Sequence, residues 1–159
     1  MKITLIAVGK IKENFYRQAI LEFQKRLGRY CKLEIIEVAD EKTPDHASAA
    51  EEIQIKEKEG QRLMKHFRED AWICALAIEG KMLDSVELSE KLESLGVSGT
   101  SHIIFVIGGS LGLADQVLKR ADYLLSFSKM TFPHQLMRVI LLEQIYRSYR
   151  ILQGAPYHK

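Results

Sequence analysis

The fold is decided by residues 101–138, SHIIFVIGGSLGLADQVLKRADYLLSFSKMTFPHQLMR. This stretch begins with a continuous apolar run at residues 103–107, which predicts a strand that is buried on both faces. The glycine pair at residues 108–109 interrupts the run, as happens where a backbone turns sharply or approaches a ligand closely. A second apolar strand, at residues 123–127, leads into a loop at residues 128–133. Because ligands of open α/β sheets bind at the carboxyl ends of strands, we expect the active site at these two adjacent strand ends.

Strands and helices alternate along the rest of the chain. Apolar runs predict further strands at residues 2–8, 32–38 and 71–78. Helices, with a short helical link before residue 123, are predicted at residues 13–29, 49–67, 85–95 and 133–152. A strand, a helix and a strand in this order form a parallel crossover unit. The sequence therefore predicts an α/β fold with a mostly parallel, five-stranded sheet flanked by helices.

Several local features of these elements are also predicted. Gly28 is expected to end the first helix in a left-handed conformation, and Asp84 or Ser85 is expected to cap the third. Residues 79–81, Glu-Gly-Lys, are expected to end the third strand in a turn or to place a carboxylate near a ligand. The apolar stripe of the first helix is expected in the core, and it consists of Phe15, Tyr16, Ala19, Ile20, Phe23 and Leu27.

Length and composition fit one globular domain. A chain of 159 residues can bury a sizeable core, and no run approaches the roughly 18 apolar residues of a membrane span. The N-terminus has no small-residue cleavage site, and the two cysteines, Cys31 and Cys74, show no motif spacing. We therefore expect a single domain over residues 1–159, cytoplasmic and without a membrane segment, with reduced thiols.

Charge is distributed unevenly, although the net charge is only +2. Residues 1–30 carry seven Lys and Arg against two Glu, and residues 129–159 carry five against one. The middle of the chain is therefore acidic. If the two basic ends meet in space they form one positive face suited to nucleic acid, and otherwise they are scattered solvated charge.

The glycine turn IGGSLGL matches the usual nucleotide-binding motifs only loosely. Its spacing is G-G-x-x-G rather than G-x-G-x-x-G, no acidic residue follows about twenty positions later, and no G-K-[ST] is present. Such a turn suits a ligand that lies flat against the backbone and lacks a polyphosphate. Adenosyl cofactors of the methionine type fit that description.

The loop SFSKMTFP has two interpretations. Its backbone amides and carbonyls can read an adenine edge, while Phe127, Met130 and Phe132 cover the faces of the ring. The plainer interpretation is a strand-to-helix turn in which Thr131 or Ser128 caps the last helix.

Histidines are the candidate titrating groups in the C-terminal part, namely His134 and His158. His158 belongs to the terminal Pro-Tyr-His-Lys, which follows a glycine. Tails are usually disordered, but one with an aromatic ring and two potential cations can close over a base and stack on it. No cysteine or histidine cluster has metal-ligand spacing, so no metal site is predicted.

Four blocks of sequence carry a family resemblance. They are MKITLIAVGK, FVIGGSLGL, LSFSKMTFPHQLMRVILLEQIYR and the terminal YHK. Together they resemble the ribosomal large subunit methyltransferase H family of small, single-domain SPOUT methyltransferases. The resemblance implies a trefoil-knotted homodimer, with the knot and cofactor site in roughly residues 71–150 and a tail at residues 153–159. It also implies that the protein uses S-adenosylmethionine to methylate N3 of a pseudouridine in 23S rRNA on the assembled ribosome.

The resemblance implies particular site residues as well. The expected cofactor pocket consists of Leu76, Gly108, Phe127, Ser128, Lys129, Met130, Thr131 and Phe132. Tyr157 and His158 match the family's terminal Tyr-His, which is expected to face the target base. We expect His158, or a neighbour from the other subunit, to assist proton loss from the target nitrogen. Arg138 is expected to act in catalysis with Tyr157 and His158. Together with Arg147 and Arg150 it is expected to hold phosphates, with ordinary salt bridges as the alternative.

Two other classes of function stay open from the residues alone. A non-catalytic ribosome- or RNA-binding module would bind RNA but no methyl donor. A nucleotide-dependent oxidoreductase would bind NAD and have no need of the SFSKMTFP loop. A cofactor titration separates all three.

Overall fold

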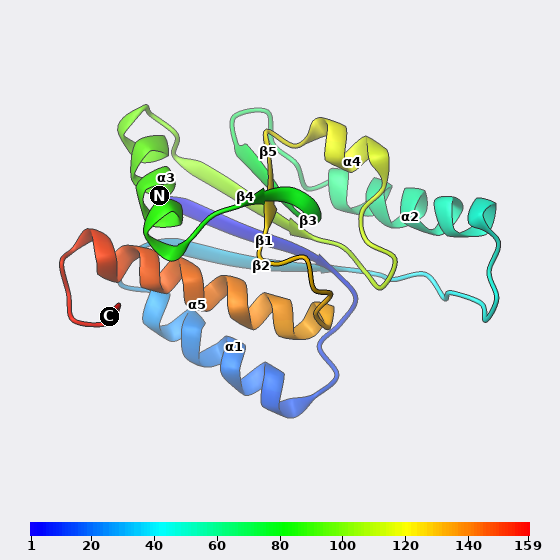
Figure 1. Ribbon diagram of the computed structural model, residues 1–159, viewed down its shortest axis with the longest axis horizontal. Helices are drawn as coiled ribbons and strands as arrows, with labels where there is room; N and C mark the ends of the chain where they lie inside the picture. The colour runs from blue at the N-terminus through cyan, green and yellow to red at the C-terminus, as the bar shows by residue number, and fades with distance from the viewer.

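The computed structural model describes all 159 residues, and its centre is one sheet of five parallel strands (Figure 1). The strands are β1 (Lys2–Val8), β2 (Lys32–Val38), β3 (Trp72–Met82), β4 (His102–Ile107) and β5 (Tyr123–Ser126). Their order across the sheet is β2-β1-β4-β3-β5. The helices are α1 (Asn14–Leu27), α2 (Ala49–Met64), α3 (Ser85–Val97), α4 (Asp115–Arg120) and α5 (His134–Leu152). The predicted α/β fold class is confirmed, and the sheet is entirely rather than mostly parallel.

Helices cover both faces of the sheet, with α1, α3 and α5 on one face and α2 and α4 on the other (Figure 1). Successive side chains of a strand point to opposite faces. In β1, Ile3 and Leu5 therefore pack with the first group of helices, and Ile6 and Val8 pack with the second. Strands buried on both faces are continuous apolar runs in the sequence, which is why β1 and β4 were predicted to within one residue.

β3 is longer than the sequence predicted. It pairs with β5 as far as Leu76 and pairs again from Lys81, so residues 77–80 bulge out of the ladder. A Cβ atom at Gly80 would lie 2.7 Å from the backbone carbon and oxygen of Leu124, so this close approach requires glycine. The predicted strand end was wrong because renewed pairing with β5 extends β3 beyond its apolar run.

Two expectations for α1 are also corrected. Gly28 has φ −58°, an ordinary right-handed value. The amides of Tyr30 and Cys31 both donate to the carbonyl of Leu27, so the chain leaves the helix without a left-handed residue. The apolar stripe is core only in part, because Leu27 is fully buried whereas Phe15 is 63% exposed.

The start of α3 is as predicted. The carboxylate of Asp84 accepts a hydrogen bond from the Glu87 amide at 2.7 Å, and the Glu87 carboxylate accepts one from the Asp84 amide at 2.9 Å. This reciprocal pair satisfies two amides that the helix itself leaves free. None of the helices combines the length and the apolar character needed to cross a membrane.

Candidate functional site

A cavity of about 840 Å³ opens at the carboxyl edge of the sheet. Its walls come from β3 and the start of its bulge at residues 76–79, the turn at residues 107–113 and the connection from β5 to α5 within residues 125–134, with further residues from α2 and α4. The strands β4 and β5 are not adjacent, because β3 lies between them. The expectation of two adjacent strand ends is therefore corrected: three strands supply the walls.

The residues predicted for the cofactor are gathered at this cavity. All of them except Lys129 line it, namely Leu76, Gly108, Phe127, Ser128, Met130, Thr131 and Phe132. The Lys129 side chain is exposed and contributes nothing to the walls. The chain thus brings together residues that are up to 56 positions apart in sequence.

The glycine turn after β4 is tight enough to require its glycines. The amide of Gly112 donates to the carbonyl of Gly109 at 3.1 Å, and Gly112 has φ +87°. A Cβ atom at Gly108 would lie 2.8 Å from the backbone carbon and oxygen of Gly112. A Cβ atom at Gly112 would meet nothing within 4 Å, so this part of the turn offers bare backbone to a ligand.

The connection from β5 to α5 is held by its own serines. The Ser126 hydroxyl donates to the carbonyl of Ser128 at 3.0 Å, and the Ser128 hydroxyl accepts from the Met130 amide at 3.0 Å. The N-cap of α5 is Pro133, which provides no side-chain hydrogen bond. The expected cap by Thr131 or Ser128 was wrong, because Ser128 is engaged within the loop instead.

Four ionisable side chains line the cavity, and sequence reasoning missed two of them. Lys56 and Asp115 come from α2 and α4, and no sequence signal joined those helices to the site. Glu79 and His134 were each considered as candidates. The Nδ1 atom of His134 is buried without a hydrogen-bond partner, and burial together with the Arg138 charge lowers the pKa of His134.

Arg138, predicted to act in catalysis, is completely buried beside the site. Its guanidinium donates to the carbonyls of Val8 at 2.9 Å and Gly9 at 2.8 Å, and to the Glu37 carboxylate at 2.8 Å. Burial lowers the pKa of Arg138, and the hydrogen bond to Glu37 opposes that shift. The guanidinium therefore ties α5 to the ends of β1 and β2, and in this position it cannot reach a phosphate.

Tyr157 and His158 lie at the other end of α5 from the cavity (Figure 1). The Tyr157 hydroxyl donates to Glu143 at 3.2 Å, and a ring nitrogen of His158 lies 3.2 Å from the Arg147 guanidinium. Arg147 follows the cavity-lining start of α5 by 13 residues, which is about 20 Å of helix. The chain does not bring these two residues into its own cavity.

The model of the family described as "Predicted SPOUT methyltransferase" matches residues 1–158. The chain belongs to the SPOUT methyltransferase family. A protein of Bifidobacterium adolescentis named "Ribosomal RNA large subunit methyltransferase H" is 70% identical over 100% of both chains. A protein of the same name from Clostridium botulinum is 61% identical, again over 100% of both.

A solved structure shares the fold of this SPOUT methyltransferase. It is a probable methylase family protein from Haemophilus influenzae, with a TM-score of 0.56 and 11% sequence identity. The match covers 99% of this chain and 70% of that one. At this sequence identity the similarity shows the fold alone, and the methyltransferase activity follows from the family.

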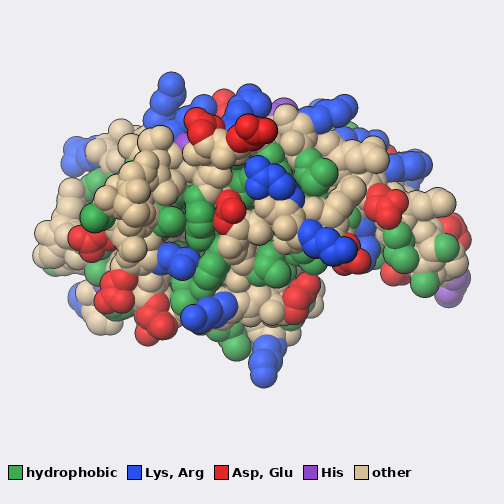
Figure 2. All heavy atoms as spheres, turned by 90° about the horizontal axis from the view of Figure 1, so that it is seen from above, with side chains coloured by type: hydrophobic (Ala, Val, Ile, Leu, Met, Phe, Trp, Pro, Cys, Tyr) green, Lys and Arg blue, Asp and Glu red, His purple; other side chains and the backbone are tan.

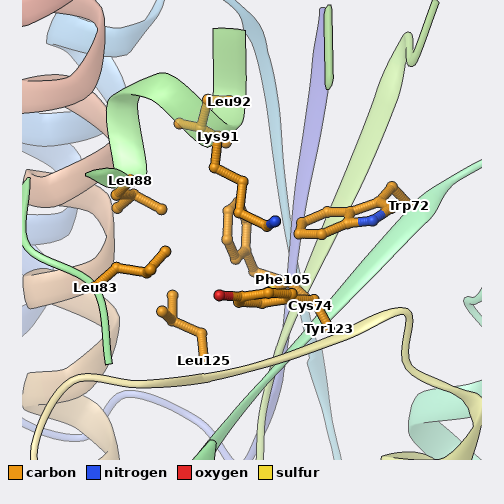
Figure 3. A pocket seen from close by; sticks show the side chains of 9 residues that line it. All are labelled: Trp72, Cys74, Leu83, Leu88, Lys91, Leu92, Phe105, Tyr123 and Leu125. Atoms are coloured by element: carbon orange, nitrogen blue, oxygen red, sulfur yellow. The ribbon is translucent and has the colours of Figure 1, made fainter. Parts of the chain in front are cut away.

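A SPOUT methyltransferase needs a site for a methyl donor, and the large cavity has room for one. A second cavity, shown in Figure 3, lies among β3, β5 and α3 and measures about 10 Å³, barely the space of one water molecule. There the Lys91 ammonium lies 4.2 Å from the centre of the Tyr123 ring and 5.7 Å from that of Trp72. No group of three or more His, Cys, Asp or Glu is placed to hold a metal ion.

Proposed function

We propose that this methyltransferase transfers the methyl group of S-adenosylmethionine to N3 of a pseudouridine in 23S rRNA on assembled ribosomes in the cytoplasm. The observation that carries the proposal is the cavity in which the glycine turn and the β5–α5 connection converge. The 70% identical relative named as a ribosomal RNA methyltransferase supports the choice of substrate.

The cavity suits an adenosyl methyl donor in both size and chemistry. Pockets for ligands of this kind measure about 300–1,000 Å³ and combine apolar walls with a few backbone polar groups. Here Phe127 and Phe132 offer apolar surface, while Gly112 offers open backbone. No lysine-bearing phosphate loop is present, which agrees with a ligand that lacks a polyphosphate.

The chemistry requires positioning more than it requires reactive side chains. The donor supplies an activated methyl group on a sulfonium sulfur. The walls of the cavity have to hold that methyl group in line with the target nitrogen at about 3–3.5 Å and exclude water around it. The imide nitrogen of pseudouridine is a poor nucleophile until it loses its proton, and we propose that His158 assists this loss.

His158 can act only in the cavity of another copy of the chain if its tail keeps the course seen here. We therefore propose a homodimer in which the tail of one subunit presents Tyr157 and His158 to the target base at the other subunit's site. Burial and the Glu143 carboxylate raise the pKa of Tyr157, so its hydroxyl stays protonated and can donate a hydrogen bond. The trefoil knot implied by the family resemblance is part of the same proposal.

The two basic ends of the chain lie side by side, and this arrangement favours RNA binding. Arg26 of α1 lies 5.5 Å from the centre of the Tyr146 ring, and Arg147 lies 4.7 Å from that of Tyr157. Arg150 donates to the Tyr30 hydroxyl at 3.2 Å. Figure 2 shows the side of the molecule that faces away from α1 and α5, where Lys and Arg side chains lie along the upper edge together with Asp and Glu. Arginines beside aromatic rings suit unpaired RNA, whose bases stack on such rings.

Methylation of ribosomes from a strain lacking this protein tests the proposal. Purified protein and S-adenosylmethionine are added to assembled ribosomes or to free 23S rRNA, and the rRNA is analysed by mass spectrometry. We expect one pseudouridine to gain one methyl group, on ribosomes and not on free rRNA. Calorimetry with S-adenosylmethionine is the companion measurement, because ribosome binding without donor binding would identify a non-catalytic RNA-binding module instead.

A further inference from the structure

His134 is the one histidine that lines the donor cavity, and the proposed chemistry leaves it without a role. It is the first residue of α5 and lies beside the end of β1, where a Cβ atom built on Gly9 would be 3.8 Å from its Cε1 atom. Its Nδ1 atom is buried and has no hydrogen-bond partner. The other ring nitrogen, Nε2, is not buried without a partner in this way, so it is the ring nitrogen that can meet a ligand.

The charges around His134 decide its state. Arg138 lies one turn further along α5, Lys12 lies in the connection from β1 to α1, and Asp40 follows β2. Burial, Arg138 and Lys12 lower the pKa of His134 against the opposing effect of Asp40, so the ring is neutral near neutral pH. Because Nδ1 is buried and has no acceptor within hydrogen-bond distance, a proton on it would be left unpaired, and we therefore assign the proton of the neutral ring to Nε2.

We propose that the Nε2–H of neutral His134 donates a hydrogen bond to a carbonyl oxygen beside the target nitrogen of the pyrimidine base. The proposal rests on the function proposed above. When the N–H proton passes to the imidazole of His158, negative charge spreads from the nitrogen to its neighbouring carbonyl oxygens. The N–C bond then forms as the C–S bond breaks, and the sulfonium charge is neutralised. A fixed donor at the oxygen stabilises this charge, and the loss of one such donor typically costs about 10²–10³-fold in rate.

The other ionisable residues of the cavity do not fit this role. Glu79 and Asp115 are exposed carboxylates and would repel a developing anion. Lys56 projects from α2 as a flexible, strongly hydrated cation and gives no fixed direction to a hydrogen bond. His134 is held against β1 and is uncharged, so it can donate without binding the donor's sulfonium or repelling it.

The test uses replacements that differ in where they place an N–H group. H134Q keeps an amide N–H near the position of Nε2, H134N places it near Nδ1, and H134A removes it. We expect H134N and H134A to lose about 10²-fold or more in kcat on ribosomes, with the calorimetric affinity for S-adenosylmethionine unchanged. H134Q should recover most of that loss and keep the pH profile of the unchanged chain, because His134 takes up no proton in the reaction.

Controls separate the possible failures. His66, just after α2 and outside the cavity, is replaced by Gln and by Ala, and both variants should turn over normally. If H134Q is as slow as H134A, if H134A keeps full activity, or if every variant loses donor affinity, the proposal is overturned. An unchanged chain that methylates no rRNA would instead overturn the proposed function itself.

Discussion

The two ends of α5 contrast in how their polar groups are satisfied. At its start, beside the cavity, His134 Nδ1 and Arg138 Nε are buried without partners, and the Pro133 cap provides no side-chain hydrogen bond. At its far end, Glu143 accepts hydrogen bonds from Arg147 at 3.0 Å and from Tyr157 at 3.2 Å. The far end also has one such atom, Arg150 Nε, so the two ends differ in degree: two buried atoms lack partners beside the cavity and one lacks a partner at the far end. Unpaired buried groups beside a cavity are compatible with a ligand there.

The contrast also separates two sets of residues that the sequence had grouped into one site. The cofactor residues gather at the start of α5, while the terminal Tyr-His is held about 20 Å away along the same rigid helix. One chain therefore presents a donor cavity and a tail that do not meet. This geometry is the reason for the proposal that two copies complete each site.

The largest effect is expected from the buried arginine at the cavity end. Arg138→Met removes the guanidinium that donates to two carbonyls and to the Glu37 carboxylate, which keeps only the Ile11 amide as a donor. We expect it to lower the free energy of unfolding by about 3–5 kcal/mol in urea denaturation. Arg147→Met, at the tail end of the same helix, removes a more exposed pair with Glu143 and should cost only about 0.3–1 kcal/mol. Equal losses would erase the contrast between the two ends.

The tail should matter for turnover and not for donor binding. His158→Ala is expected to reduce the methylation rate on ribosomes by about 10²-fold, because it removes the proposed proton acceptor. Calorimetric binding of S-adenosylmethionine should stay the same, since His158 does not line the cavity. A variant that methylates at the normal rate would exclude His158 from the mechanism.

The glycine turn should matter for donor binding. In Gly108→Ala the new Cβ atom would overlap the backbone of Gly112, and relieving an overlap of this kind costs about 1–3 kcal/mol. We therefore expect donor affinity measured by calorimetry to fall by roughly 10–100-fold. Gly96→Ala is the matched control: its Cβ atom would approach no closer than 3.8 Å, to Met1, so donor affinity should not change.

The smallest effect concerns how firmly the tail is held on its own chain. Tyr157→Phe removes the hydrogen bond to Glu143 and should lower the free energy of unfolding by about 1 kcal/mol. Thermal and urea denaturation at low protein concentration measure this difference. An unchanged free energy would show that the tail does not rest on Glu143 in solution.

The elements were predictable where one local pattern dominates. Both sides of β1 and β4 are buried, so their apolar runs locate them without knowledge of their partners. The end of β3 was not predictable, because its last residues are held by renewed pairing with β5 across a bulge. The hydrogen bond of Ser128 was also not predictable. A serine hydroxyl can bond within its own loop or cap the next helix, and the residue type does not decide between the two.

Arg138 shows the same limit at the candidate site. From sequence, an arginine near a predicted RNA-binding face is a reasonable phosphate ligand. Only the structure shows that the Arg138 side chain is buried and cannot take that role. The carbonyls that hold it belong to Val8 and Gly9, roughly 130 residues away in the chain. No spacing rule connects positions that far apart.

The sequence by itself determined the alternation of strands and helices and two of the segments that line the cavity, the glycine turn and the β5–α5 connection, since these follow from local apolar pattern and glycine placement. Only the tertiary structure decided that β3 separates β4 from β5, that Arg138 is buried and joins α5 to the ends of β1 and β2, and that the terminal Tyr-His lies at the far end of α5. The physical reason is that strand order, burial and distance are set by contacts between remote segments, whereas propensity and periodicity describe only neighbours along the chain.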